Sequence, residues 1–496
     1  MTVANGLLPF KLSLVHKPLS ITGHGGLTCV CEALISLFPK AYYRGLAKAL
    51  GYKSWRTVYR HFQSLVLLIA SGGDHVDDIA VLRADPALQK LILVRLSSPT
   101  QLLDFLYRFH QAEDGRRLTK RDDQALSVKG VAHIRPEGPG LVVLAGALTE
   151  VVRRVQAIRP YTRATLDVDA TIVEAHKSEA LKAYEGTIGY QPQVSLWAEQ
   201  GLLVCDEFRD GNVPAEFQVL EFLKKAFGKL PRSVTKRYLR GDSALYNEAA
   251  LSWADENGIK FAVSADMSPS LRAKVVAIPE RDWKPLARPA AEACADSTAE
   301  PPHEERQWAE VIDFVPEWGC NRKKDGKPFR YYAIRVRSTQ PDLLDPEATS
   351  WRHFAIVTNI REEEDGWDGG RVIRWQRQKQ GTVEQAHKVM KDELAAGHLP
   401  CGRFGANAAW WRLNAIVFAV LEYLKAAALP KEMRPLRPKA LRFHVLNLCG
   451  RVVESGRQLF LQISTELPGA QLLADARCAL LAQAAVLGKD LVTKPD

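Results

Sequence analysis

Residues 164–173, ATLDVDATIV, decide the fold: this apolar stretch carries two carboxylates, Asp167 and Asp169. Its composition and length predict a buried β-strand. A second short strand, within RYLRGDSALYN (237–247), ends at Asp242, and GTVEQAHKVMKDEL (381–394) places Glu384 in the first turns of an amphipathic helix. Two strand-end aspartates followed by a helix-borne glutamate are the carboxylate set of a two-metal phosphoryl-transfer site.

Such a site holds two divalent ions, one beside the attacking oxygen and one beside the leaving oxygen. Hard ions such as Mg²⁺ prefer oxygen ligands and pair with substrate phosphates, so Mg²⁺ or Mn²⁺ is the expected cofactor. The chain of 496 residues has a formal net charge of +10 and an isoelectric point near 9.1. This charge favours a polyanion such as DNA as the partner, although on its own it fits any basic soluble enzyme.

The length exceeds one comfortable hydrophobic core, so several domains are expected. In residues 161–280, three consecutive strands precede alternating helices and strands, a pattern that fits an RNase H-like mixed sheet. We therefore predict an α/β fold with five parts. They are a helical N-terminal DNA-binding region (1–160), the first part of an RNase H-like core (161–280), a β-rich insertion (281–350), the second part of the core with the glutamate helix (351–430) and a C-terminal region (431–496).

Residues 287–306 are rich in Ala, Pro and acidic residues, which predicts an exposed loop or linker. RQWAEVIDFV (306–315) and PFRYYAIRVRS (328–338) then alternate apolar and polar residues as strands do. These two segments are the candidate β insertion. HFAIVTNI (353–360) is expected to rejoin the main sheet.

The N-terminal region contains the outline of a helix-turn-helix. Its first helix, over 44–50, offers Leu46, Ala47 and Leu50 to a core. The second begins after Ser54, a favourable N-cap residue, and carries apolar residues at positions 58, 62 and 65. Such a second helix can enter a DNA major groove, but a pair of ordinary packed helices fits as well. The basic residues expected to contact DNA here are Arg44, Lys48, Arg56 and Arg60.

The glutamate helix is expected to begin after Thr382 and to stop at Gly397. Residues seven apart return to nearly the same helix face, so Glu384 and Lys391 point the same way. Arg377, Lys388 and Lys391 are predicted to contact DNA phosphates near this helix. An ordinary surface helix with a Glu384–Lys388 charge pair remains the alternative.

Eight scattered cysteines complete no zinc pattern and indicate free thiols in a reducing compartment. No apolar run of 18 uncharged residues occurs, and the first residues lack a signal-peptide layout. A cytoplasmic protein without membrane association is therefore expected.

Further segments follow in order along nearly the whole chain, among them SGGDHVDDIAVLRADPAL (71–88), LDVDATIVEAHK (166–177), RDGNVPAEF (209–217), LRGDSALY (239–246) and LPCGRFGANAAWWRLN (399–414). Together they resemble the DDE transposases of bacterial insertion sequences, in the hairpin-forming group that has a β insertion before the glutamate. Within that group the resemblance is greatest to the insertion-sequence family thirteen-eighty.

The resemblance implies a role for each carboxylate. Asp169, in Asp–Ala–Thr, matches the first catalytic carboxylate, Asp242, in Gly–Asp–Ser, the second, and Glu384 the third. Asp167 lies two residues from Asp169 on the same strand face and is the alternative first carboxylate.

The broader group often shows Tyr-x2-Arg-x3-Glu-x6-Lys around the glutamate, and Glu384 and Lys391 fit this signature. Arg377 and Gln380 stand at its Tyr and Arg positions, which weakens the transfer of those two roles.

The resemblance also implies a reaction. Water cuts a phosphodiester at the element's end and releases a 3′-OH, which attacks the opposite strand to make a hairpin. The hairpin is then opened, and the 3′-OH attacks target DNA, for which the family favours TTAA-like sites. The implied partners are double-stranded terminal inverted repeats and target DNA, bound by a homodimer at the bacterial nucleoid. An aromatic residue of the insertion is expected to stack a flipped base, with Trp308, Trp318 and Trp375 as candidates and core packing as the simpler role of each.

Three other functions remain open. A domesticated, catalytically silent transposase would bind DNA without cutting it. A plain RNase H-like nuclease would hydrolyse strands but never join them. A basic α/β protein unrelated to nucleic acid would show no salt-sensitive affinity for DNA.

Overall fold

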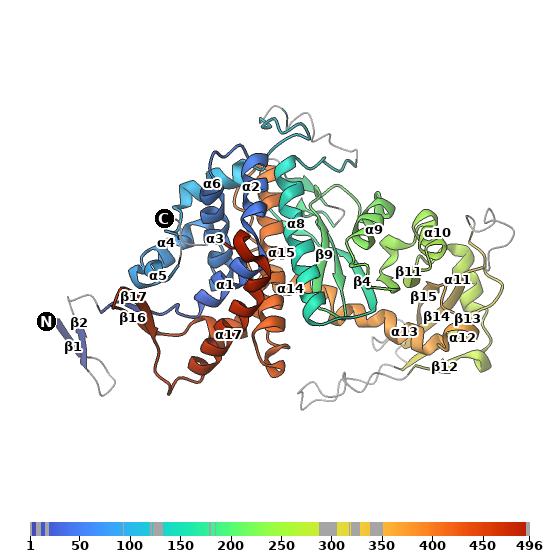
Figure 1. The fold of residues 1–496 in the computed structure, drawn as a ribbon. Helices are drawn as coiled ribbons and strands as arrows, with labels where there is room; N and C mark the ends of the chain where they lie inside the picture. The colour runs from blue at the N-terminus through green and yellow to red at the C-terminus, as the bar shows by residue number, and fades with distance from the viewer. Residues whose placement is uncertain are drawn as a thin grey trace. The chain divides into compact units, whose positions relative to one another are not determined.

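The computed structural model describes residues 2–5, 11–14, 19–92, 94–119, 122, 132–177, 180–183, 185–286, 305–316, 318, 328–337 and 351–492. The chain divides into two compact units (Figure 1). Unit 1 combines residues 1–118, 137–151 and 390–496, and unit 2 combines 119–136 with 152–389. The N-terminal and C-terminal parts of the sequence therefore contribute to one unit.

Unit 1 is mainly helical and is built around one apolar helix, α15 (Phe404–Ala427). Nearly all of its side chains are buried, which explains why its sequence is apolar on every face. It packs against α1 (Leu27–Leu37), α3 (Trp55–Ser71) and α6 (Pro99–Tyr107). Other described helices with residues in this unit are α2 (Lys40–Ala49), α4 (Ile79–Arg83), α5 (Pro86–Leu91), α8 (Pro139–Ile158), the end of α14 (Val383–Asp392), α16 (Pro438–Leu441) and α17 (Gly469–Ala484).

The predicted helix pair of the N-terminal region is confirmed as α2 and α3, with Ser54 at the N-cap position of α3. Leu46 and Ala47 of α2 are buried, as are the three predicted core residues of α3, Val58, Phe62 and Leu65. However, α3 is buried continuously from residue 61 to 70, so most of its length is a core helix. Only its first turn, with exposed Arg56, has the access that DNA contact requires.

Unit 1 also contains a β-hairpin that the sequence analysis missed. Strands β16 (Gly450–Ser455) and β17 (Gln458–Gln462) pair antiparallel, and β16 also pairs with β3 (Ile21–Thr22). The two-residue turn, Gly456–Arg457, has positive φ at both positions, as a type I′ turn requires.

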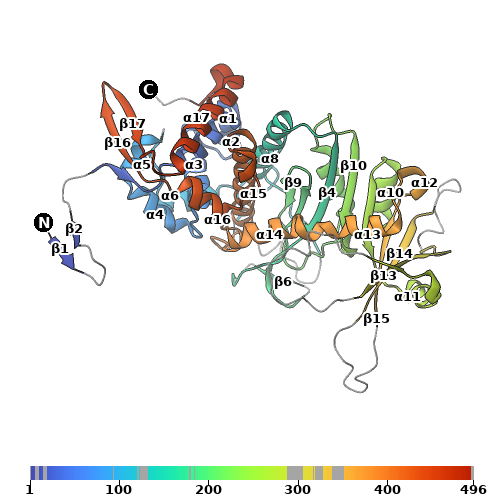
Figure 2. The ribbon, with the colours of Figure 1, turned by 90° about the horizontal axis from the view of Figure 1, so that it is seen from below.

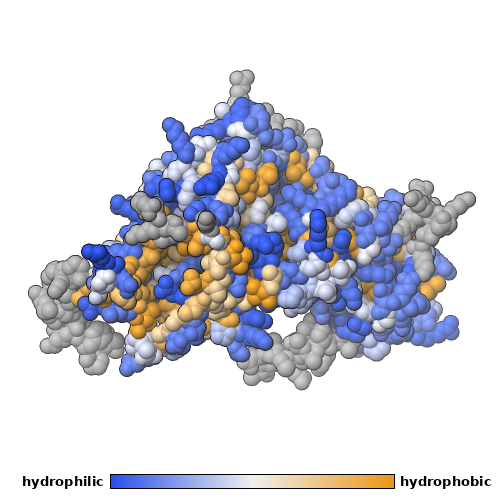
Figure 3. Space-filling model, viewed as in Figure 1, coloured by the Kyte–Doolittle hydropathy of each residue, from blue (hydrophilic) through white to orange (hydrophobic). Residues whose placement is uncertain are grey.

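Apolar side chains remain exposed on unit 1, and Figure 3 shows orange residues gathered on one face. The exposed apolar side chains of this unit include Phe443, Leu459, Phe460, Leu481 and Val486. By length and composition alone, the helical stretch Gly469–Gly488 is long and apolar enough to cross a membrane. About 22% of its most apolar part is buried within the fold.

Unit 2 is built on one nine-stranded sheet in the order β12-β13-β14-β15-β11-β10-β4-β8-β9. Its central strands are β4 (Arg163–Ala170), β10 (Lys236–Gly241) and β11 (Lys260–Ala265), which are parallel neighbours. On one side β8 (Gln193–Trp197) and β9 (Leu202–Glu207) form an antiparallel hairpin that turns at Gly201. A small separate sheet of unit 2 contains β5 (Val173–Glu174), β6 (Leu181–Lys182) and β7 (Ile188–Tyr190).

In unit 1, β1 (Thr2–Asn5) pairs only with β2 (Lys11–Leu14) among the described residues.

The predicted insertion strands do not form a sheet of their own. Strands β12 (Lys284–Pro285), β13 (Arg306–Val311) and β14 (Arg330–Arg337) extend the main sheet antiparallel beyond β15 (Trp351–Thr358). As predicted, β15 rejoins the sheet, because it pairs with β11. Most of residues 287–306 lie outside the described residues.

Helices cover both faces of this sheet. Helix α9 (Val219–Gly228) connects β9 to β10 and packs on β9, and α10 (Glu248–Glu256) connects β10 to β11 and packs on β11. Helix α13 (Gly369–Arg377) packs against β11 and β13 and leads directly towards α14 (Val383–Asp392), as Figure 2 shows. Two short helices, α11 (Pro269–Val276) and α12 (Glu362–Asp365), complete the unit.

The cysteines in the described residues are free thiols, as predicted. Cys29, Cys31, Cys205 and Cys401 are buried, whereas Cys449 and Cys478 are exposed. Burial raises the pKa of the Cys29 and Cys31 thiols to about 12, so both remain protonated at neutral pH.

Candidate active site

Two parallel strands bring the two predicted aspartates together. In the ladder between β4 and β10, Asp167 lies opposite Arg240. The same register, continued by two residues, places Asp169 beside Asp242 at the ends of the strands. Residues two apart on a strand share a face, so all four side chains lie on one side of the sheet.

Asp167, the alternative first carboxylate, is fully buried and already has a partner. Its Oδ1 accepts from Arg240 Nε at 2.6 Å and its Oδ2 accepts from Arg240 Nη2 at 2.7 Å. The Thr382 hydroxyl donates to the same Oδ2. Arg240 Nη1 also donates to the Trp375 carbonyl at 2.7 Å, which ties α13 to the sheet. Asp167 thus has a structural role in joining β4 to β10 and to the segment after α13, whereas Asp169 lines the cavity described below.

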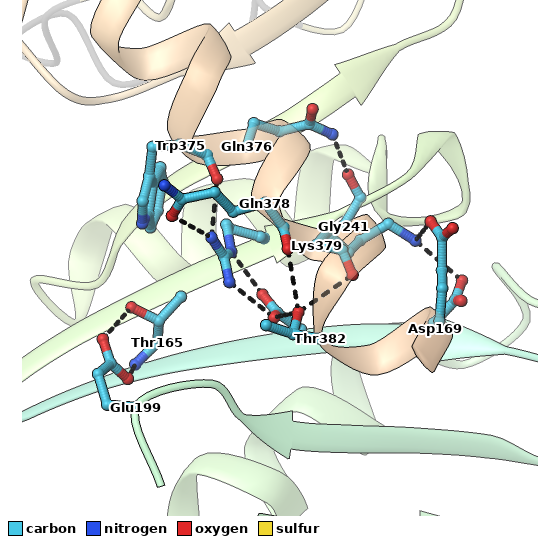
Figure 4. Close-up of polar contacts among 12 residues, drawn as sticks. Thr165, Asp169, Glu199, Gly241, Trp375, Gln376, Gln378, Lys379 and Thr382 are labelled. Atoms are coloured by element: carbon cyan, nitrogen blue, oxygen red, sulfur yellow. Dashed lines mark hydrogen bonds and ion pairs between the residues drawn. The ribbon is translucent and has the colours of Figure 1, made fainter. Parts of the chain in front are cut away.

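A 3₁₀ turn, η6 (Gln378–Gly381), separates α13 from α14 and brings a lysine between the carboxylates. Lys379 Nζ lies 3.1 Å from Asp169 Oδ1 and 3.5 Å from Glu384 Oε1 (Figure 4). His387, one turn along α14 from Glu384, is buried, with Nε2 at 3.7 Å from Asp169 Oδ2.

The three carboxylates line one cavity of about 540 Å³, which we call the carboxylate cavity. Its lining residues come from unit 2, on β4, the end of β10, β11, β13, β14, β15, α13, the η6 turn and α14. The positively charged lining residues are Arg306, Arg352, Arg377 and Lys379. A concave site with acids at its base and basic side chains around them suits an anionic substrate.

The ionisation of Asp169 is strongly perturbed. Burial and the like charge of Asp242 raise the pKa of Asp169 to about 7, against the lowering effect of Lys379. Only 12% of the Asp169 side chain is exposed, whereas 45% of Glu384 is. Lys379 is 8% exposed, and although burial lowers the pKa of its ammonium group, the three surrounding carboxylates outweigh burial and raise that pKa. Two acids this close share a site that favours either a proton or a cation.

The residues fit hard divalent ions. Carboxylate oxygens from two strands and one helix converge on one cavity, and they already surround one cation, the Lys379 ammonium. Among the described residues, no three His, Cys, Asp or Glu side chains are arranged as a ready-made metal site. Binding two ions here therefore requires local rearrangement around Lys379.

The predicted basic residues occupy different surroundings. Arg377 lines the carboxylate cavity, whereas Lys388 is exposed on α14 and Lys391 is half-buried in its last turn. In unit 1, Arg44, Lys48 and Arg56 are exposed and Arg60 is half-buried. Helix α14 starts after Thr382 as predicted but ends at Asp392, so the expected stop at Gly397 was wrong.

Sequence reasoning missed Lys379, which is the closest cation to two of the three carboxylates. The predicted helix began after Thr382, and in the preceding turn only Arg377 and Gln380 were assessed, as the Tyr and Arg positions of the signature. A lysine five residues before the glutamate was the available signal. Among the tryptophans, Trp308 and Trp375 belong to one buried apolar cluster, whereas half-buried Trp318 packs edge-on against Tyr246.

The chain was compared with protein-family models, curated proteins and solved structures. The model described as "Transposase DDE domain group 1" matches residues 56–485. No curated protein matches the chain. A solved structure of a piggyBac transposase synaptic complex with hairpin DNA aligns with 95% of this chain and 86% of its own chain, at 10% sequence identity and a TM-score of 0.42. Since the family model spans most of the sequence and all three carboxylates, the chain belongs to the DDE transposase family.

Proposed function

We propose that this chain catalyses cut-and-paste transposition of a bacterial insertion sequence related to insertion-sequence family thirteen-eighty. Asp169, Asp242 and Glu384 are the catalytic carboxylates. The convergence of these three acids on one cavity with a basic rim carries the proposal. The strand order β9-β8-β4-β10-β11, three antiparallel strands followed by two parallel ones, supports an RNase H-like core for the site.

Two divalent ions, Mg²⁺ or Mn²⁺, held by these carboxylates would stabilise charge on the attacking and leaving oxygens. The protein's own part is to position the DNA. Arg306, Arg352 and Arg377 are placed at the cavity wall, where guanidinium groups hold phosphates in a fixed orientation. Lys379 holds largely buried Asp169 and exposed Glu384 together until DNA and ions arrive.

The chemistry is a series of in-line displacements at phosphorus. In the first, the oxygen of water forms a bond to phosphorus, the bond to the 3′ oxygen breaks, and that oxygen leaves as a 3′-OH with a proton from solvent. In the next, the oxygen of that 3′-OH bonds to phosphorus on the opposite strand, the bond from this phosphorus to the 3′ oxygen of the flank breaks, and the flank leaves with a 3′-OH while the element's end closes as a hairpin. Water then opens the hairpin: its oxygen bonds to the same phosphorus, and the 3′ oxygen of the element leaves again as a 3′-OH. Finally this 3′-OH bonds to a phosphorus of the target DNA, and the 3′ oxygen of the target strand leaves as a 3′-OH. Two ends must be held together, so a homodimer assembled on the terminal repeats is the proposed active form.

A silent DNA-binding protein is the second candidate, and one observation favours it. Lys379 lies between Asp169 and Glu384 and offsets part of their negative charge, as expected of a site that needs no metal ion.

Strand joining separates the candidates. A pre-cut duplex carrying the repeats that flank the gene, with a labelled 3′-OH end, is incubated with supercoiled plasmid and Mg²⁺. Wild type is expected to join the label to plasmid, Glu384→Gln to bind without joining, and exposed Glu248→Gln on α10 to behave as wild type. Metal-independent binding without joining would support the silent protein, and cutting of intact ends without joining would support a nuclease.

A further inference from the structure

A second cavity of about 790 Å³ opens on unit 2, and arginine is the most frequent residue type in its lining. Among the residues that the structure describes, six arginines line it and Glu199 is the only acidic lining residue. We call it the arginine cavity; its arginines are Arg163, Arg240, Arg306, Arg371, Arg374 and Arg377. Such an excess of positive charge in a concave site attracts anions.

Part of this charge is already neutralised within the fold. Arg240 is paired with Asp167, and Arg163 Nε lies 3.1 Å from Glu199 Oε1. Glu199 is also bound by the backbone N–H of Thr165 at 2.8 Å and by its hydroxyl at 2.6 Å. The arginines on the sheet side of the cavity, Arg163 and Arg240, are therefore both paired with carboxylates.

The wall formed by α13 differs. Arg371 is exposed and Arg374 is half-buried. Within the described part of the chain, no carboxylate lies at ion-pair distance from either residue. The two guanidinium groups are three residues apart on one helix, so they lie on neighbouring positions of the same face.

Aromatic rings orient the guanidinium groups of this cavity. Arg371 lies over the ring of Trp367, 4.5 Å from its centroid, and Arg163 lies 4.1 Å from the centroid of Tyr238. The Trp367 and Tyr238 rings are nearly parallel, 6.2 Å apart. A guanidinium that stacks on a ring keeps its N–H groups in the plane, where they can grip the two oxygens of a phosphate.

The arginine cavity and the carboxylate cavity are neighbours. Arg306, Arg377 and Gln380 line both. The η6 turn lies between them: Lys379 lines the carboxylate cavity and Gln378 the arginine cavity. A polyanion held at the carboxylates can therefore continue into the arginine cavity along shared arginines.

We propose that the arginine cavity binds backbone phosphates of the DNA strand that passes through the carboxylate cavity, with Arg371 and Arg374 gripping phosphates next to the cut. This inference rests on the proposed function, because it assumes that DNA is the substrate. The volume of the arginine cavity is large enough for one or two nucleotide units and lies within the usual range of ligand sites.

The test is a coupling experiment between side chains and single phosphates. Duplexes carrying the flanking repeat are made with one neutral methylphosphonate at each position around the repeat–flank junction. Binding is measured without divalent ions, so that no bond is cut. The proteins are wild type, Arg371→Ala/Arg374→Ala, and the charge-matched control Arg232→Ala/Arg272→Ala, whose two arginines are exposed and line neither cavity.

Wild type is expected to lose about tenfold or more in affinity at one or two phosphates near the junction, as when a charge-assisted hydrogen bond is removed. Arg371→Ala/Arg374→Ala should bind native DNA correspondingly more weakly and lose nothing further at those phosphates. Its salt dependence should weaken by a log–log slope of about 1.8, for two phosphate contacts at about 0.9 each. The control should reproduce the wild-type pattern.

Independent, multiplying losses from the two changes, or unaltered binding by Arg371→Ala/Arg374→Ala, would overturn the proposal. Thermal unfolding checks the fold of each variant. Arg371→Lys/Arg374→Lys, which keeps the charge but loses the planar fork, should give an intermediate affinity, and wild-type affinity from it would also count against the proposed grip.

The two proposals fail separately. Coupling at the junction without cutting or joining after Mg²⁺ is added would overturn the proposed function and leave the phosphate site standing. Cutting and joining without coupling would do the reverse.

Discussion

Replacing the catalytic Asp169 by asparagine should stabilise the protein at neutral pH. Most substitutions of a buried polar residue destabilise. Asp169 differs because burial and neighbouring Asp242 raise its pKa to about 7, so its ionised form is unfavourable in the folded state. Asparagine has nearly the same shape and never ionises.

The size of the effect follows from the pKa shift. From the ordinary value of 3.8 to about 7 is roughly three pKa units, at about 1.36 kcal/mol each, or about 4 kcal/mol. Between pH 4 and pH 7 the folded state binds a proton that the unfolded state has lost, so wild-type stability falls as pH rises through this window. The cost is absent below pH 4 and complete above pH 7.

The assay is urea-induced unfolding of wild type and Asp169→Asn at pH 4, 5.5 and 8, with a chelator present. The variant's advantage should be near zero at pH 4, about half of the full value at pH 5.5 and about 4 kcal/mol at pH 8. Asp167→Asn is the contrasting control on the same strand. It leaves buried Arg240 without its carboxylate partner and should cost about 3–5 kcal/mol.

Two results would refute this reasoning. One is an Asp169→Asn variant that is less stable than wild type at pH 8. The other is a gain of the same size at pH 4 and pH 8, because a pH-independent gain has no connection with ionisation.

Three further predictions concern the site and the core. Lys379→Met should lower the melting temperature in chelator by an amount equivalent to roughly 3 kcal/mol, since it breaks a buried ion pair. Added Mg²⁺ should then stabilise Lys379→Met more than it stabilises wild type. The control, exposed Lys388→Met, should change stability by less than about 0.5 kcal/mol in a thermal melt. Mg²⁺ at about 100 times its dissociation constant should stabilise wild type by about 2.7 kcal/mol and leave Asp169→Asn nearly unchanged, which calorimetry can check. Phe62→Ala should cost about 3–5 kcal/mol in denaturant unfolding, because Phe62 is fully buried against the rings of Phe38, Tyr42 and Tyr43.

The sequence predicted the local elements of unit 2 well, because each is encoded nearby. The strand around Asp169, the strand that ends at Asp242 and the helix that carries Glu384 all have clear apolar patterns. The expectation that the aspartates stand at strand ends is confirmed, and the ladder between β4 and β10 explains their proximity.

Long-range features were harder to predict. The antiparallel extension of the main sheet by β13 and β14 depends on pairing partners that no local pattern specifies. The β16–β17 hairpin was overlooked although Gly456–Arg457 is a reasonable turn signal. Lys379 escaped notice because a 3₁₀ turn breaks the helical period between α13 and α14, so its side-chain direction cannot be derived from the spacing to Glu384.

Mg²⁺-dependent cleavage of an intact, end-labelled duplex that carries the flanking repeats tests the central claim most directly. Wild type should nick the DNA at the repeat–flank junction. Asp169→Asn, Asp242→Asn and Glu384→Gln should each bind the same duplex and leave it intact, while Glu248→Gln should cut as wild type does. Cleavage by any of the three carboxylate variants at the wild-type rate would contradict the assignment of that residue to the reaction centre.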